Sequence, residues 1–153
     1  MKRWVAYLGG LAVILLLPHG QGMDVGKLQP AEILHIYIEE GATVVATDTG
    51  NIGAGKNLKD ALESMEGNAD GVVFLDTVAY VLVTEDTKDL LPELGKLLRP
   101  GTEVVLAPGR MEIKNLARFL RVHDPKIRLC DCLAGRTELP KLMMAGERCY
   151  LVQ

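Results

Sequence analysis

Hydrophobic and polar positions along the chain switch between the spacing of strands and the spacing of helices. Residues 32–39 and 43–47 are rich in β-branched and aliphatic side chains, and Glu40-Gly41 between them favours a turn, so a β-hairpin is predicted. Leucine, alanine and methionine then recur at helical spacing from Leu58 to Met65, and Gly67-Asn68 ends that pattern. The pattern thus begins with antiparallel strands followed by a helix.

The middle of the chain alternates strands with helices. Apolar runs predict four strands, over residues 72–75, 79–83, 103–107 and 127–130. Apolar residues spaced by three and four predict helices over 90–98 and 113–120. The order strand, helix, strand, helix, strand over residues 79–130 predicts two βαβ units with right-handed crossovers.

A second hairpin is expected at the end of the sequence, where Leu142–Met144 and Cys149–Val152 flank a turn. Strands 80–83 and 104–106 are apolar without strict alternation, as central strands covered on both faces should be. The fold class that follows is α/β or α+β, with a mixed sheet, hairpins at both ends and two central βαβ units.

The first 22 residues have the layout of a secretory signal. Lys2 and Arg3 give a positive start, and Val5 to Pro18 is uncharged. Gly20 and Gly22 then supply the small residues that a signal peptidase needs. The apolar stretch is short for a membrane span, which requires about 20 residues. A cleaved signal is therefore favoured, and an uncleaved anchor that tethers the protein to the membrane is the alternative.

The expected organisation is a signal peptide or anchor over residues 1–22 and one mixed domain over residues 23–153, with a single core. Such a protein is secreted or extracytoplasmic, where nucleotide cofactors are scarce, and no cofactor is expected. The formal net charge is -3, and no basic patch stands out. Nucleic acid is therefore not an expected partner.

One motif offers a nucleotide site. Residues 50–56 fit the spacing G-x4-G-K between a predicted strand and a predicted helix, with Gly50, Gly55 and Lys56 in the positions that cradle phosphate. Asp76 ends an apolar run, as a magnesium-binding aspartate would. Asn57, however, replaces the hydroxyl residue that ligates the metal. The simpler interpretation is a glycine-rich turn followed by a helix that Asn57 caps.

The three cysteines offer a thiol or metal site. Cys130 and Cys132, on one predicted strand, share a face and cannot easily bond each other, whereas Cys149 could pair with either. A metal site of all three, with His123 as a fourth ligand, is the alternative. The spacing Cys-x-Cys is unlike that of closed zinc sites, so buried thiols or one disulfide are favoured.

Catalytic constellations are not evident. His19 leaves with the signal, His35 lies within a predicted strand, and His123 ends a predicted helix, where a positive imidazole suits the helix dipole. No Ser-His-Asp or Cys-His arrangement can be assembled, so no catalytic residue and no enzymatic activity are expected.

Three aspartates complete the candidate chemistry. Asp76 and Asp86 are candidates for a carboxylate pair, but sequence separation does not give their distance. Asp131, between two cysteines, could tune a thiol, although a solvated strand edge is favoured for it.

Several segments between residues 41 and 109 occur in a familiar order. They are the glycine-opened helix Gly53–Met65, the segment Val73–Thr84, the leucines at 90, 91 and 94, Arg99-Pro100 and the strand Val104–Ala107. On these segments, the chain resembles the N-terminal domain of the C subunit of bacterial spore germinant receptors.

This resemblance implies a non-enzymatic interaction domain, because that subunit is an extracytoplasmic part of a membrane receptor assembly. The implied partner is a protein or a component of the cell envelope. Members of the family are longer and are anchored through a lipid-modified cysteine, whereas no cysteine lies near the predicted cleavage site here. The resemblance also accounts for residues 53–56 without any phosphate.

Overall fold

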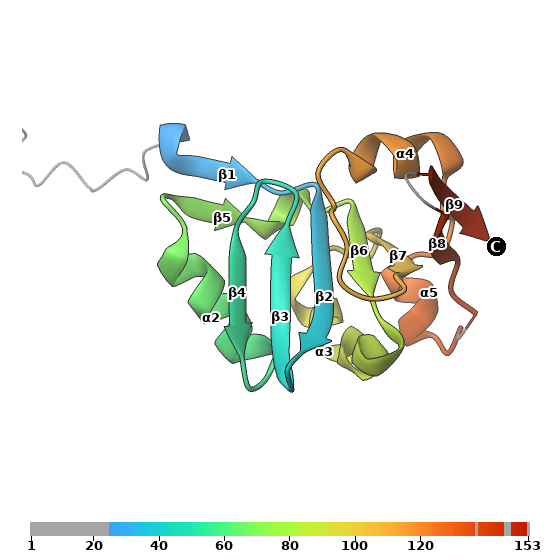
Figure 1. Ribbon diagram of the computed structural model, residues 1–153, viewed down its shortest axis with the longest axis horizontal. Helices are drawn as coiled ribbons and strands as arrows, with labels where there is room; N and C mark the ends of the chain where they lie inside the picture. The colour runs from blue at the N-terminus through green and yellow to red at the C-terminus, as the bar shows by residue number, and fades with distance from the viewer. Residues whose placement is uncertain (1–24, 137, 146–147, 153) are drawn as a thin grey trace, which may run out of the picture.

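The computed structural model describes residues 25–136, 138–145 and 148–152, so the expected signal over residues 1–22 lies outside the described part. The main sheet has seven strands: β2 (Ile33–Glu39), β3 (Ala42–Thr47), β4 (Ile52–Gly55), β6 (Tyr80–Val83), β7 (Glu103–Leu106), β8 (Lys141–Ala145) and β9 (Arg148–Val152). The helices are η1 (Val25–Lys27), α2 (Leu58–Asn68), η2 (Leu75–Thr77), η3 (Glu85–Leu90), α3 (Leu91–Leu97), α4 (Leu116–His123) and α5 (Leu129–Leu133). A small parallel sheet pairs β1 (Leu28–Pro30) with β5 (Val72–Phe74). The mixed fold with helices packed on a sheet is confirmed (Figure 1).

The sheet is parallel in its middle and antiparallel at its ends, in the order β4-β3-β2-β6-β7-β8-β9. β2 pairs with β6, β6 with β7 and β7 with β8 in parallel. The hairpins β2–β3 and β8–β9 add antiparallel pairs, and β4 extends the first of them. Both predicted hairpins and the unit β6–α3–β7 are therefore confirmed.

The second predicted βαβ unit does not end in the expected strand over residues 127–130. Residues 127–130 form a single antiparallel bridge between Glu103 and Arg128, and α5 then begins at Leu129. The carboxylate of Asp131 accepts a hydrogen bond from the Arg128 N–H at 3.1 Å, which stabilises the first turn of α5. The crossover from β7 reaches β8 instead, through one register pair between Leu106 and Lys141.

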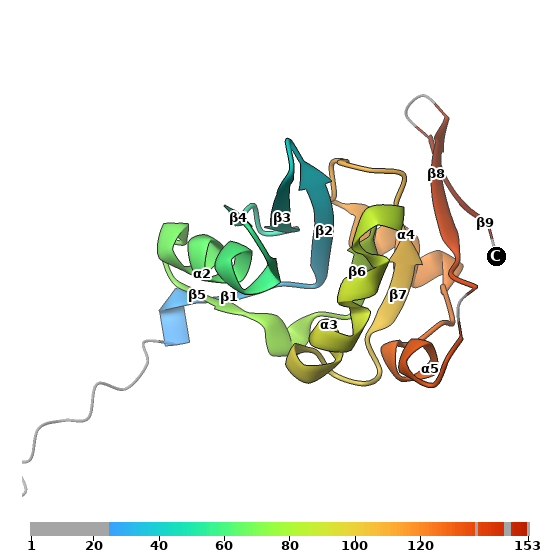
Figure 2. The same ribbon diagram turned by 90° about the horizontal axis from the view of Figure 1, so that it is seen from below.

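Helices cover the sheet on both faces, so the molecule has three layers (Figure 2). One face carries α2, α3 and α5, whose buried side chains include Met65, Leu94 and Leu129. The other face carries α4, which buries Leu116 and Leu120. Two hydrophobic clusters thus lie on opposite sides of the same strands, as the unbroken apolar pattern of the central strands predicts.

The second half of the glycine-rich run is strand β4 rather than a loop. A Cβ atom added to Gly53 would lie 2.2 Å from the Ala61 carbonyl oxygen, and one added to Gly55 would lie 2.5 Å from the Ala61 nitrogen. Both glycines therefore let the backbone of α2 approach β4 closely. As expected, Asn57 caps α2: its side-chain oxygen accepts from the Asp60 N–H at 2.9 Å.

This close approach predicts opposite effects for two neighbouring substitutions. Gly53→Ala should lower the free energy of unfolding by about 3 kcal/mol, because the methyl group meets backbone that cannot rotate away. Lys56→Ala should leave it nearly unchanged, because Lys56 is exposed. Denaturant unfolding measures both. We expect magnesium ATP not to stabilise the unaltered protein. If residues 50–56 bound phosphate, magnesium ATP would stabilise the unaltered protein, and Lys56→Ala would abolish that stabilisation.

Candidate functional site

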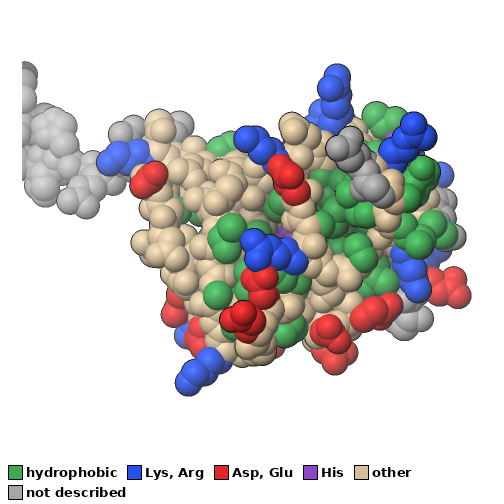
Figure 3. All heavy atoms as spheres, viewed as in Figure 1, with side chains coloured by type: hydrophobic (Ala, Val, Ile, Leu, Met, Phe, Trp, Pro, Cys, Tyr) green, Lys and Arg blue, Asp and Glu red, His purple; other side chains and the backbone are tan. Residues whose placement is uncertain are grey.

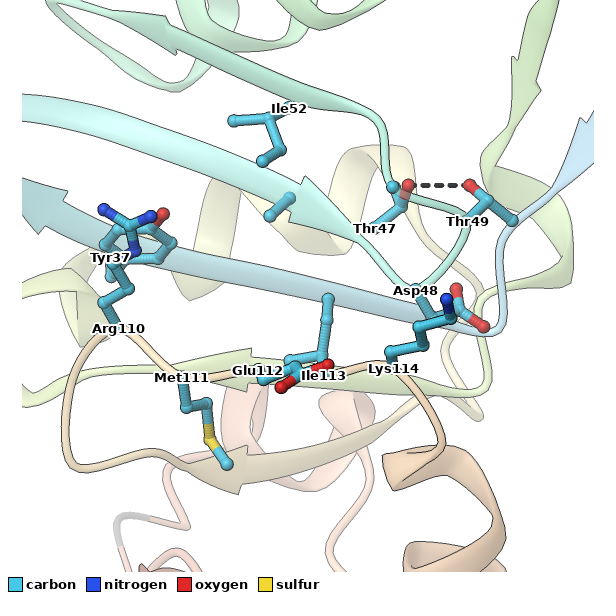
Figure 4. A pocket seen from close by; sticks show the side chains of 12 residues that line it. Tyr37, Thr47, Asp48, Thr49, Ile52, Arg110, Met111, Glu112, Ile113 and Lys114 are labelled. Carbon is cyan, nitrogen blue, oxygen red and sulfur yellow. Dashed lines mark hydrogen bonds between the residues drawn. The ribbon is translucent and has the colours of Figure 1, made fainter.

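A groove of about 560 Å³ opens between the sheet and the segment of residues 108–115, which we call the covering segment (Figure 4). The covering segment leaves the end of β7 and crosses the sheet face before α4 begins. Ile113, expected as the first turn of a helix, instead anchors this segment and is buried against the sheet, while α4 starts at Leu116. The groove therefore exists because α4 starts late and leaves extended chain over β2.

One end of the groove is built around Tyr37 on β2. The Arg110 guanidinium donates to the Glu39 carboxylate at 2.6 Å, and Figure 4 shows Arg110 lying beside the Tyr37 ring. Burial raises the pKa of Tyr37, and Glu39 raises it further while Arg110 opposes the change. The Tyr37 hydroxyl therefore stays protonated at neutral pH and is a donor as well as an acceptor.

The other end of the groove is the turn between β3 and β4. Oδ1 of Asp48 accepts from the N–H groups of Glu32 and Ile33 at 3.0 and 3.1 Å, which ties this turn to the start of β2. The hydroxyl oxygens of Thr47 and Thr49 lie 2.8 Å apart. Lys114 of the covering segment also lines this end of the groove (Figure 4). Both ends of the groove are therefore polar and charged.

Between these ends the lining is apolar. Ala46 and Ile52 line the groove from the sheet, and Met111 and Ile113 line it from the covering segment. Ile52, on the edge strand β4, is 52% exposed. The whole arrangement has the size and the mixed lining of a small-molecule site.

His35 lies buried on the same face of β2 as Tyr37. The rings of the two residues are 4.8 Å apart. Neither ring nitrogen of His35 has a well-formed hydrogen bond within the described residues. The nearby Gly109 backbone raises the pKa of His35 by less than burial lowers it. Burial dominates and lowers the pKa of His35 from 6.5 to about 4. His35 is therefore a neutral core residue at physiological pH, as its place in a predicted strand suggested.

The residues of the nucleotide hypothesis do not converge on one site. Gly50 lines the groove at the β3–β4 turn, whereas Gly55 packs on α2. Lys56 is exposed, and Asp76 is exposed in η2 beside a separate pocket of about 390 Å³. The start of α2 is already occupied by its own cap and by the acidic side chain at its first turn, so it offers poor binding to an anion.

The cysteines are also dispersed. Cys130 and Cys132 lie on α5 rather than on a strand, because residues 129–133 are helical, and Cys149 lies on β9. All three are free thiols, and burial raises the pKa of Cys132 and of Cys149. No group of three metal-ligating side chains is found within the described residues.

The remaining candidates take structural positions. The Nδ1–H group of His123 donates to the Phe119 carbonyl oxygen at 2.9 Å, and the imidazole stacks on the Phe119 ring. Asp76 and Asp86 lie before and after β6, so they are at opposite ends of that strand. Asp131 caps α5, which corrects its expected place on a strand edge, and its charge adds to the raised pKa of Cys132.

Sequence reasoning missed the groove residues Tyr37, Asp48, Arg110 and Lys114. They come from three separate segments, none of which forms a local motif. One signal was present: Arg110 follows Pro108-Gly109 at the carboxyl end of a predicted parallel strand, where binding loops of open α/β sheets lie.

Comparisons with known proteins add no family. No family model, no curated protein and no solved structure matches this chain. Across the part of the chain that the structure describes, no helix has the length and apolar character needed to span a bilayer.

The burial of His35 predicts an acid-sensitive fold. The pKa is about 4 in the folded protein and 6.5 in the unfolded chain, so the unfolded chain takes up a proton first as the pH falls. The stability that neutral His35 contributes is complete above pH 6.5 and is lost towards pH 4, to a total of order 3 kcal/mol. Urea unfolding of the protein and of His35→Phe, each at pH 7 and 4.5, measures this difference.

The variant should lose much less stability on acidification than the unaltered protein does. His123→Gln is the matched control, because His123 is exposed, and it should follow the unaltered protein. Parallel pH profiles for the protein and His35→Phe would show that His35 does not account for the acid sensitivity.

Proposed function

We propose that this protein is a secreted or envelope-associated, non-enzymatic domain that binds another protein or a component of the cell envelope. The observation that carries the proposal is the surface of the β8–β9 hairpin. Its outer face presents Met143 opposite Tyr150 and ends with Val152, and these side chains are about half exposed. Exposed apolar groups gathered on one face are typical of interaction surfaces.

The position of the hairpin supports the same proposal. β8 is joined to β7 by a single register pair, and the hairpin projects from the body of the molecule (Figure 2). Figure 3 shows hydrophobic side chains gathered at this end, around α4 and the hairpin. An isolated two-stranded hairpin is marginally stable in water, so a partner that covers it gains both apolar burial and order.

The expected signal and the resemblance to a germinant-receptor subunit agree with an extracytoplasmic interaction domain. The nucleotide and thiol or metal alternatives draw less support, because Lys56 and Asp76 lie apart and the three cysteines are dispersed.

Site-specific photocrosslinking tests the proposal in the cells that produce the protein. A benzophenone amino acid in place of Tyr150 should capture a protein or an envelope polymer, because Tyr150 lies at the centre of the exposed face. The same probe in place of Phe74, which is 37% exposed at the opposite part of the fold, is the matched control and should capture it at least tenfold less.

The compartment is measured on the same material by sequencing the N-terminus of the mature protein, which should begin after Gly22. Equal capture at both positions, or full-length unprocessed protein in the cytosol, would contradict the proposal.

A further inference from the structure

We infer that the groove beside the covering segment binds an elongated organic acid with an anionic group at each end and an aliphatic middle. This inference goes beyond the proposed partner binding. The groove lies over β2–β4, at the other end of the sheet from the β8–β9 hairpin. The two sites can therefore be tested and can fail separately.

The first end supplies hydrogen-bond donors around Arg110. Its guanidinium has five N–H donors and uses one of them in the 2.6 Å bond to Glu39. That bond also shows that a carboxylate fits beside the Tyr37 ring. The remaining donors of Arg110, with the protonated Tyr37 hydroxyl, leave room for a second carboxylate at this end.

The second end supplies donors around Lys114. Lys114 forms no ion pair within the described residues, so its ammonium group is available. Thr49 accepts from the Asn51 side-chain amide at 3.0 Å and shares a hydrogen bond with Thr47. The single proton of Thr47 is shared between Thr49 and the Asn51 carbonyl oxygen, which lies 3.5 Å from the Thr47 hydroxyl, so Lys114 is the main donor at this end.

Figure 4 shows Arg110 and Lys114 at opposite ends of the groove, so a ligand that contacts both must be elongated. Arg110 and Lys114 are four positions apart in the chain, so their Cα atoms lie at most about 14 Å apart. Ala46, Ile52 and Ile113 line the stretch between them and offer no polar group from their side chains. A ligand with methylene groups in this stretch keeps its contacts apolar while its two ends are hydrogen-bonded.

The acidic residues of the groove determine whether a substitution strengthens or weakens the binding of an anionic ligand. Asp48 keeps its negative charge, which the two backbone N–H groups that donate to its Oδ1 partly offset. Glu112 lines the groove, is exposed and has no ion-pair partner within the described residues, so it repels an anionic ligand. Removing the charge of Glu112 should therefore strengthen the binding of an acid and weaken the binding of an amine.

Calorimetric titration of the secreted protein with suberate tests the inference. Suberate should bind at least tenfold more tightly than octanoate, which has one carboxylate, and more tightly than 1,8-octanediol, which has none. Arg110→Gln and Lys114→Gln should each weaken suberate binding about tenfold, and Glu112→Gln should strengthen it about threefold. The exposed residues Arg118 and Lys96 provide the matched controls Arg118→Gln and Lys96→Gln, which should leave binding unchanged.

Equal affinity for suberate and octanoate would overturn the two-ended assignment. Tighter binding of 1,8-diaminooctane, or weaker suberate binding in Glu112→Gln, would overturn the anionic one. Circular dichroism of each variant shows whether it is folded, and a suberate affinity that none of the folded groove variants alters would place the acid outside the groove.

Discussion

The pairing of β2 on both of its edges and the burial of both of its faces constrain the rest of the structure. β2 is antiparallel to β3 and parallel to β6, so its backbone polar groups are satisfied within the sheet. Its residues Ile33 to Tyr37 are buried towards two different hydrophobic clusters. A strand in this position joins the antiparallel hairpin to the parallel half of the sheet. Helix α2 packs on β3 and β4, and η3 packs on β2 and β6. His35 belongs to β2, which is why its imidazole is held without charge.

Glycines before a helix can either bind phosphate or allow the helix to pack closely on a strand. A G-x4-G-K sequence before a helix is what a phosphate cradle needs, because backbone N–H groups must approach an anion. Here Gly53 and Gly55 lie under α2 instead, and the missing Cβ atoms make room for helix backbone. The second half of the motif is a paired strand rather than a loop, and the start of the helix is capped by its own residue. Close packing thus accounts for the glycines.

The two surfaces of functional interest arise from segments that join the core elements. The covering segment lies over the sheet because Ile113 is buried there, and this places charged side chains at both ends of the groove. The hairpin projects because only one register pair holds β8 to β7. Both surfaces therefore depend on what lies after β7, where the chain departs most from the regular alternation of strands and helices. The sheet contributes one side of the groove, through Tyr37, Ala46 and Ile52.

The sequence by itself determined the two hairpins, the helix capped by Asn57 and the central strands, because period-two and period-3.6 patterns and turn residues act locally. It did not determine residues 127–133, because residues 127–130 were expected as a strand. Asp131 and the carbonyl groups of the turn before β7 provide partners that favour a helix there. The groove was also decided by tertiary structure alone, since Tyr37, Asp48 and Arg110 come from distant segments. Local patterns fix which face of an element is apolar, whereas only packing decides which elements, and therefore which charges, come together.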